Sequence, residues 1–274
     1  MRHARGVLQL GEPVVMGVLN VTPDSFSDGG RFLDPARALE RGLAMEAEGA
    51  SFIDVGGEST RPGADPVTVE EELRRVLPVV AALARACRVL ISVDTSRPEV
   101  IERVVDAGAA MINDVRALRH PGALAAVAKS GAAACLMHMR GEPATMQQAV
   151  HYDDVVTEVR TMLGERLAEC VSHGIDAARI CVDPGFGFGK LAGHNLQLLR
   201  RLRELQPLGR PVLVGLSRKS MLRELTGRGI GDRLAGSVAL ATAAVMNGAS
   251  IVRAHDGAPT CDAVRVAAAL LEQE

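Results

Sequence analysis

Aromatic side chains are scarce in this sequence. Phe, Trp and Tyr together make up 2% of the 274 residues, and Trp is absent. A surplus of one charge is also lacking, because the formal net charge is −2 and the Lys and Arg residues form no sustained block. Without a basic block the chain offers no surface for phosphate backbones, so nucleic-acid binding is not expected. No apolar run is long enough for a transmembrane helix, so no membrane partner is expected either.

The five cysteines lack the C-x-x-C spacing of a redox or metal motif. They stand far apart in the chain: Cys87, Cys135, Cys170, Cys181 and Cys261. Cysteines spaced in this way, some of them within apolar runs, are typical of reduced thiols in a packed interior. No long apolar segment follows the positive charges of the first residues, so we expect no secretory signal. Together these features predict a cytoplasmic protein.

Three common catalytic or cofactor signatures are also missing. The histidines show no metal-ligand spacing such as H-x-x-x-H, so a zinc site is not expected. No G-x-S-x-G elbow is present, so covalent catalysis by the protein is not expected. The segment DPGFGFGK, residues 183–190, has G-x-G-x-G spacing and continues with Leu191, which fits neither the Rossmann nor the P-loop pattern.

Eight short apolar segments are present and alternate with longer amphipathic ones. They span residues 14–20, 51–57, 89–95, 111–115, 133–139, 180–185, 212–217 and 251–256. Continuous apolar runs bounded by turn residues indicate strands buried on both faces. Helical patterns lie between them, as over Pro35 to near Gly49, Pro98 to Ala107, 153–173 and 232–247. Eight such pairs without a linker predict an α/β fold, a single-domain (β/α)8 TIM barrel over residues 1–274, with a doubly wound sheet as the alternative.

Nearly every predicted strand ends in a polar residue that is able to bind or react. In chain order these are Asn20, Gly57 with Glu58, Asp94, Asn113 with Asp114, His138, Asp183, Ser217 followed by Arg218 and Lys219, and Arg253 with His255. In a barrel the carboxyl ends of all strands meet on one face, where the active sites of this fold are built. We therefore expect these residues to converge on one pocket.

Asp94, Asn113 and Asp183 have two possible interpretations. Each alone is compatible with a helix cap or a turn, because Asp and Asn are common there. Together they resemble a rigid row of acceptors for a flat heterocycle that displays N–H donors. Lys219 is either an ordinary surface lysine or, with Ser217 and Arg218 beside it, a cation for an anionic group or an electron-rich carbonyl.

Arg253 and His255 lie two residues apart on a strand and so share a face. The pair suggests a clamp for a diphosphate, with a structural His255 as the alternative. His138, between two methionines, is expected to be a packed structural histidine. If a metal takes part, oxygen ligands and a substrate diphosphate favour Mg²⁺, with Asn20 as the protein ligand.

Two loops rich in glycine and proline follow the first and second strands. They include GVLNVTPDSFSDGG, residues 17–30, and GGESTRPGADP, residues 56–66. Loops of this length after barrel strands are often lids that close over a substrate. Their clustered polar residues, and Phe26 between Asp24 and Asp28, argue against simple connectors.

Several separate stretches between residues 17 and 256 carry a family resemblance. They are LNVTPDSFSDGG, DVGGESTRPGA, ISVDTSRPEVI, INDVRAL, LMHMRGEPATMQ, DPGFGFGK with HNLQLLR, GLSRKSML and VRAHD. Their number and order resemble the dihydropteroate synthase family. One small departure is Ala254, where a valine is expected, and it leaves Arg253 and His255 in place.

The resemblance implies an enzyme that joins 6-hydroxymethyl-7,8-dihydropterin diphosphate to 4-aminobenzoate, giving 7,8-dihydropteroate and pyrophosphate. It implies that Asp94, Asn113, Asp183 and Lys219 hold the pterin, with Phe188 and Arg253 against its faces. It further implies Asn20 on Mg²⁺, with Thr60, Arg253 and His255 at the diphosphate, and Ser217, Ser220, Arg61, Pro62 and Phe26 around the aminobenzoate. Asp24 and Asp28 would approach the pterin cation when the lid closes, and a homodimer is implied.

Two other functions remain as alternatives. A pterin-dependent methyltransferase domain that serves a corrinoid protein shares the barrel and the acceptors, but does not need the two loops or the SRKS lysine. A non-catalytic paralogue would bind the pterin or a partner protein without turnover.

Overall fold

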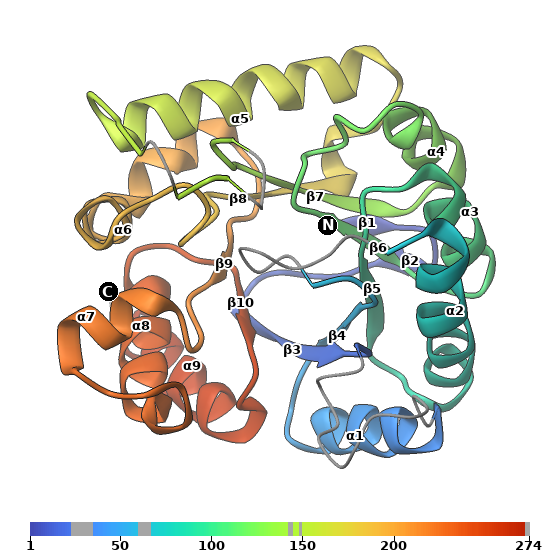
Figure 1. The fold of residues 1–274 in the computed structure, drawn as a ribbon, viewed down its shortest axis with the longest axis horizontal. Helices are drawn as coiled ribbons and strands as arrows, with labels where there is room; N and C mark the ends of the chain where they lie inside the picture. Colours follow the sequence, from blue (N-terminus) through green and yellow to red (C-terminus); the bar gives the residue numbers. More distant parts are fainter. Residues whose placement is uncertain (23–34, 60–66, 142–144, 148–149, 272–274) are drawn as a thin grey trace.

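A closed barrel of eight parallel strands forms the centre of the molecule (Figure 1). The computed structural model describes residues 1–22, 35–59, 67–141, 145–147 and 150–271. The barrel strands are β3 (Val14–Asn20), β4 (Phe52–Gly56), β5 (Leu90–Asp94), β6 (Met111–Asp114), β7 (Ala133–Met137), β8 (Ile180–Asp183), β9 (Leu213–Gly215) and β10 (Ile251–Ala254). All eight lie within the segments that the sequence predicted.

The strands follow one another around the barrel in the order β8-β7-β6-β5-β4-β3-β10-β9. A parallel bridge between Val182 and Val212 joins the two ends of this row, and the Val182 amide donates to the Pro211 carbonyl at 3.0 Å. The barrel is therefore closed, and the predicted TIM-barrel fold is confirmed.

Helices surround the barrel on its outer side (Figure 1). They are α1 (Pro35–Ala47), α2 (Val69–Ala86), α3 (Pro98–Asp106), α4 (Ala123–Ser130), α5 (Val155–Ser172), α6 (Ala192–Arg200), α7 (Ser220–Thr226), α8 (Leu234–Met246) and α9 (Gly257–Leu271), with the short 3-10 helices η2 (Ala177–Arg179), η3 (Leu202–Leu208) and η4 (Ile230–Asp232). Side chains fix where two of them begin, because Thr68 caps α2 and Asp154 caps α5. Among the described helices, none combines the length and apolar character needed to cross a membrane.

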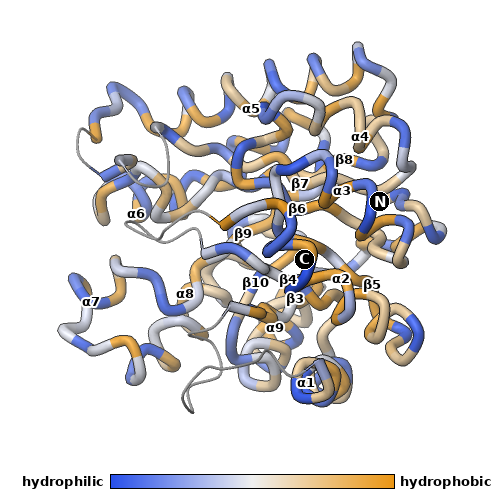
Figure 2. The backbone as a smooth tube through the Cα atoms, turned by 45° about the vertical axis from the view of Figure 1, so that its right-hand side comes forward, coloured by the Kyte–Doolittle hydropathy of each residue, from blue (hydrophilic) through white to orange (hydrophobic). Residues whose placement is uncertain are grey.

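Alternation along the strands creates two apolar layers, and hydrophobic residues accordingly mark the central strands in Figure 2. Residues such as Ile53, Val93 and Ile112 point outward and pack under the helices. The barrel interior is filled by Met16, Phe52, Met111, Ala133, Cys135, Cys181, Leu213 and Ile251. The five cysteines are free and buried, as predicted.

A short hairpin at the N-terminus was not predicted. Strands β1 (Arg2–His3) and β2 (Gly6–Val7) pair antiparallel and are too short to show a periodic pattern. The neighbouring Met1, Leu8 and Leu10 pack against the apolar cluster inside the barrel. The hairpin therefore covers the end of the barrel where the strands begin, and the opposite end is left for the polar residues.

Candidate active site

The polar strand ends are aligned across four neighbouring strands. Asn20 pairs with Gly56, Gly56 with Asp94, and Asp94 with Asn113. A Cβ at Gly56 would lie between two of these residues in van der Waals contact, 3.4 Å from Asn20 Oδ1 and 3.7 Å from Asp94 Cβ. The glycine thus leaves space between the amide oxygen and the carboxylate.

Arg253 is the centre of a charged cluster in the barrel. Its Nε donates to Asp54 Oδ2 at 2.6 Å, and one terminal nitrogen donates to Asp94 Oδ2 at 3.2 Å. Asn113 Nδ2 donates to the same Asp54 oxygen at 3.0 Å. Asp54 therefore holds two groups from strands that are far apart in sequence, the guanidinium of Arg253 and the amide of Asn113.

Asp54 was missed by the sequence reasoning, which considered only the strand ends. It lies inside the apolar run FIDVG and is completely buried. A charged residue at such a position, two residues before Gly56 and on the same face, was the available signal. Its second oxygen, Oδ1, has no hydrogen-bond partner among the described residues.

Burial shifts the acidity of the two other carboxyl groups at the site. It raises the pKa of Asp94, and the positive charge of Arg253 opposes that shift. It also raises the pKa of Asp183 to about 6, although the Gly185 amide, which donates to Asp183 at 2.7 Å, favours the ionised form. Both carboxyl groups therefore ionise less readily than exposed ones, so a ligand that contacts them is able to change their state of ionisation.

Lys219 is not an ordinary surface residue. Its side chain is half-buried, and Nζ lies 4.4 Å from the centroid of the Phe188 ring. Burial and the charge of Arg253 lower the pKa of Lys219 to about 8. Gly187, at φ +82°, allows the lysine to approach, since a Cβ there would stand 3.3 Å from Lys219 Cδ.

His255 and Ser217 form a hydrogen-bonded pair at the ends of the neighbouring strands β10 and β9. His255 Nδ1 lies 3.1 Å from Ser217 Oγ, which also accepts from the His255 amide at 3.3 Å. Burial, and then Arg253, lower the pKa of His255 to about 4, so the ring is neutral near pH 7. Ser220, also predicted here, is exposed as the first residue of α7.

His138 is a structural residue, as expected. It is buried, and its Nδ1 lies 2.9 Å from Nζ of Lys190, a second buried lysine that the sequence reasoning did not single out. Burial lowers the pKa of His138 to about 2.

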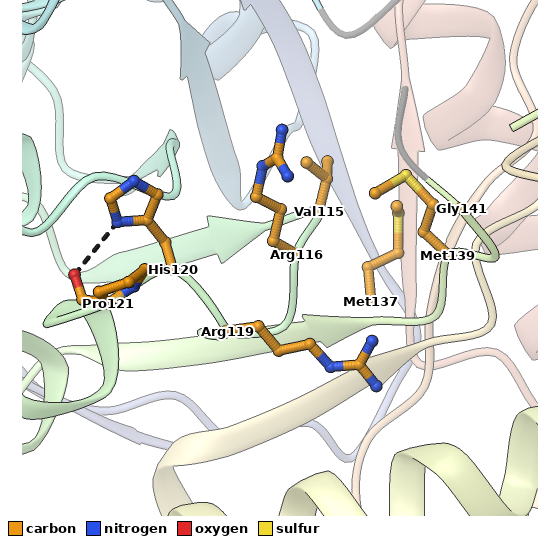
Figure 3. A pocket seen from close by; sticks show the side chains of 8 residues that line it. All are labelled: Val115, Arg116, Arg119, His120, Pro121, Met137, Met139 and Gly141. Carbon is orange, nitrogen blue, oxygen red and sulfur yellow. Dashed lines mark hydrogen bonds between the residues drawn. The ribbon is translucent and has the colours of Figure 1, made fainter. Parts of the chain in front are cut away.

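A cavity of about 210 Å³ lies between the loops that follow β6 and β7. In Figure 3 its apolar part is formed by Val115, Met137 and Met139, and its polar part by Arg116, Arg119 and His120. Met137 is the register partner of Asp183, so the cavity borders the cluster around Arg253 and does not contain it. It therefore borders the site with both apolar and cationic side chains.

Several predicted residues lie outside the described part of the chain. They are Asp24, Phe26, Asp28, Thr60, Arg61 and Pro62.

A divalent cation fits the described residues only as an ion shared with a ligand. Among these residues no group of three or more His, Cys, Asp or Glu is arranged to hold a metal. Asn20 supplies one amide oxygen beside Asp94, and a hard ion such as Mg²⁺ readily takes its remaining oxygens from phosphate and water.

The fold and this cluster define a class, the TIM-barrel enzymes whose site lies at the carboxyl ends of the strands. Residues 16–255 match the family described as pterin binding enzyme. The chain is 53% identical to dihydropteroate synthase of Escherichia coli K12 over 264 residues, which cover 96% of this chain and 94% of that protein.

Solved structures agree with this match. The Yersinia pestis dihydropteroate synthase, in complex with a sulfonamide drug, is 48% identical, with a TM-score of 0.94 over 99% of this chain and 100% of the other. The Xanthomonas albilineans enzyme in complex with 7,8-dihydropteroate is 47% identical, with a TM-score of 0.85 over 96% and 95%. The chain belongs to the dihydropteroate synthase family of pterin-binding enzymes, which sets aside the corrinoid methyltransferase alternative.

Proposed function

We propose that the protein condenses 6-hydroxymethyl-7,8-dihydropterin diphosphate with 4-aminobenzoate to give 7,8-dihydropteroate and pyrophosphate. The observation that carries this proposal is the meeting of Asp94, Asn113 and Asp183 with the cation of Lys219 at one barrel mouth. Such a set offers acceptors for the N–H groups of a pterin and a donor for its carbonyl. The Xanthomonas relative that holds dihydropteroate supports the choice of product.

The pterin would lie in the barrel with its ring between two kinds of wall. Phe188 provides one face, and the guanidinium of Arg253, fixed by Asp54 and Asp94, provides the other. Val115 and Met137 would close the edge near Asp183. Because these groups are held before the ligand arrives, little ordering is needed on binding.

Departure of the diphosphate would be the step that the protein assists electrostatically. Arg253, His255 and Thr60 would contact its oxygens, with Asn20 as the protein ligand of a shared Mg²⁺, which when bound would offset the charge of the leaving group. The neutral His255 is suited to donate a hydrogen bond in the free enzyme. The carbocation at the pterin methylene would be delocalised into the ring, near the carboxylates Asp24 and Asp28.

The arylamine of 4-aminobenzoate is already a neutral nucleophile, so the reaction requires no strong general base. Its ring would lie among Ser217, Ser220, Arg61, Pro62 and Phe26. In this proposal the loop with Phe26 closes after the diphosphate and Mg²⁺ have bound, so the second substrate's site is completed last.

A pyrophosphate-release assay with both substrates, with and without Mg²⁺, tests the proposal. We expect turnover that requires both substrates and the metal. Folded protein that binds the pterin but releases no pyrophosphate would instead support the non-catalytic alternative. Asp94→Asn should weaken pterin binding strongly, and unchanged affinity by calorimetry would remove Asp94 from the ring-binding set.

We also propose a homodimer in the cytoplasm. Large exposed apolar side chains occur on the neighbouring helices α7, α8 and α9 and on η4: Leu225, Ile230, Leu234, Val266 and Leu270. A second copy that covers them would remove this surface from water. The buried free thiols support a reducing compartment.

A further inference from the structure

Lysine is rare in this chain, and its placement is uneven. The sequence has three lysines, at positions 129, 190 and 219, against 28 arginines. Lys129 is exposed on α4, whereas Lys190 is buried and Lys219 is half-buried at the barrel mouth. Surface cations in this chain are therefore nearly always arginines, and two of its three lysines, Lys190 and Lys219, lie near each other at the barrel mouth.

The ammonium of Lys190 is surrounded by acceptors. Its three nearest acceptors are His138 Nδ1 at 2.9 Å, the Gly185 carbonyl at 2.9 Å and the Phe188 carbonyl at 3.1 Å, and the His138 carbonyl lies farther away at 3.4 Å. An ammonium has three N–H donors, so each has a partner. Two of the acceptors belong to the lysine's own loop, and the third belongs to the chain that follows β7.

The loop from Gly185 to Lys190 curls tightly around this ammonium. Gly185 and Gly189 have φ values of +68° and +62°. A Cβ at Gly185 would stand 1.9 Å from the His138 carbonyl oxygen, and one at Gly189 would stand 2.5 Å from the Arg140 carbonyl oxygen. The loop therefore lies with its backbone directly against the neighbouring segment, which only glycine permits.

Other side chains bind the remaining polar groups of the same loop. Gln147 Nε2 donates to the Gly187 carbonyl at 2.7 Å, and the Tyr152 hydroxyl donates to the Gly189 carbonyl at 3.0 Å. Asn195 Oδ1 accepts from the Gly187 amide at 2.8 Å. The loop is thus held from outside by three side chains and from inside by Lys190.

We propose that Lys190 is a positioning residue, an internal ammonium around which residues 185–190 fold so that Phe188 stands beside Lys219 at the barrel mouth. The Phe188 carbonyl accepts from Lys190 while the Phe188 ring faces Lys219, so one residue connects the two lysines. The link to pterin binding rests on the proposed function, but the fold of the loop around the ammonium does not.

Arginine is unable to replace this lysine. A guanidinium is planar and directs its N–H groups into one plane, whereas the three acceptors surround a compact ammonium. Burial lowers the pKa of Lys190 to about 7, and the nearby charge of Asp183 opposes this shift. Below that pH the ammonium keeps all three donors.

Kinetics of Lys190→Met, with the exposed Lys129→Met as the control, test the positioning role. We expect the KM for the pterin diphosphate to rise about tenfold or more, the effect of losing one well-placed contact, with kcat reduced. The KM for 4-aminobenzoate should change less than about twofold, since that ring lies elsewhere. Lys190→Arg should behave like Lys190→Met. A folded Lys190→Met or Lys190→Arg with wild-type KM for the pterin would overturn the proposal.

A measurement on the unchanged protein covers the case in which Lys190→Met does not fold. Selective ¹⁵N labelling of lysine gives three side-chain signals, which Lys129→Met and Lys219→Met assign. At about pH 6, below the pKa of Lys190, its ammonium hydrogens should exchange with water at least about tenfold more slowly than those of Lys129, because every one is hydrogen-bonded. Exchange as fast as that of Lys129 would overturn the proposal. Because no substrate is needed, failure of the synthase assay leaves this test intact.

Discussion

The carboxylate of Asp54 receives hydrogen bonds from β10 and β6, through Arg253 and Asn113. We predict that Asp54→Ala lowers the free energy of unfolding by about 2–4 kcal/mol. The largely buried guanidinium of Arg253 would lose its shorter ion pair, and among the described residues it would keep only the ion pair with Asp94. Urea unfolding measures this, and Asp153→Ala, in an exposed pair with His151, should cost less than about 1 kcal/mol. Pterin affinity should fall as well, and a variant with wild-type affinity would contradict the bridging role.

If Asp183 binds the pterin as proposed, we predict that pterin binding depends on pH. Its pKa is about 6 in the free protein, and a ligand that donates N–H groups to the ionised form lowers that value on binding. Affinity should therefore be independent of this group above about pH 6.5 and should fall as the pH drops through about 6.

Calorimetric titrations with the dihydropterin between about pH 4.5 and 8 would show this profile. Asp183→Asn should remove the part of the pH dependence near 6, whereas any part due to Asp94, whose pKa is also raised, should persist. Identical profiles for the wild type and Asp183→Asn would exclude Asp183 as the titrating acceptor.

Individual residues were predictable where they stand at strand ends. The meeting of Asp94, Asn113 and Asp183 at one barrel mouth was predicted because each stands at the end of an apolar run. Asp54 and Lys190 were not found, since their roles depend on partners from distant strands and loops. Such partners become visible only when the chain is folded.

At the scale of elements, the close contacts of Gly185 after β8 lead to a prediction about stability. Gly185→Ala should lower the free energy of unfolding by more than about 2 kcal/mol, because the new Cβ would overlap the His138 carbonyl oxygen and φ is +68°. Gly193→Ala, in α6 with open space around it, should be neutral or slightly stabilising. Thermal unfolding of the two variants tests this prediction. Equal melting temperatures would contradict the close approach of Gly185 to the His138 carbonyl.

Element boundaries were predicted unevenly, for a physical reason. Strand β3 matches its predicted range of 14–20, since its apolar run ends abruptly in polar residues. Strand β9 is shorter than predicted, with three residues in place of six, because Val212 forms only an isolated bridge and Leu216 and Ser217 already belong to the turn toward α7. Apolar character reveals burial, but it does not show where hydrogen bonding to the neighbouring strands stops.

At the scale of the whole molecule, the exposed apolar side chains on α9 and η4 predict self-association. We expect light scattering to report a dimer for the wild type and a monomer for Ile230→Glu combined with Val266→Glu, because burying two carboxylates opposes the interface. Leu43→Glu, on the exposed side of α1, should leave the dimer intact. A monomeric wild type at micromolar concentration would refute the proposed interface.

The count of eight strands was enough to predict a barrel, but not to predict the contact that closes it. A TIM barrel places sequential strands side by side, but the seam between β8 and β9 is made by an isolated bridge between Val182 and Val212, for which the sequence has no signal. The hairpin under the barrel escaped prediction for a similar reason, since it is defined by its contact with the interior cluster.

The hydroxyl of Tyr152 donates to the Gly189 carbonyl, and Cζ of Arg140 lies 4.3 Å from the centroid of the Tyr152 ring. This is the chain's single tyrosine, and the chain has no tryptophan, so nearly all of its intrinsic ultraviolet emission comes from one phenol. The intensity and lifetime of that emission depend on the hydrogen bond to the loop that carries Phe188. The protein therefore contains its own fluorescent probe of that loop, and stopped-flow fluorescence can follow the loop in real time without any attached dye.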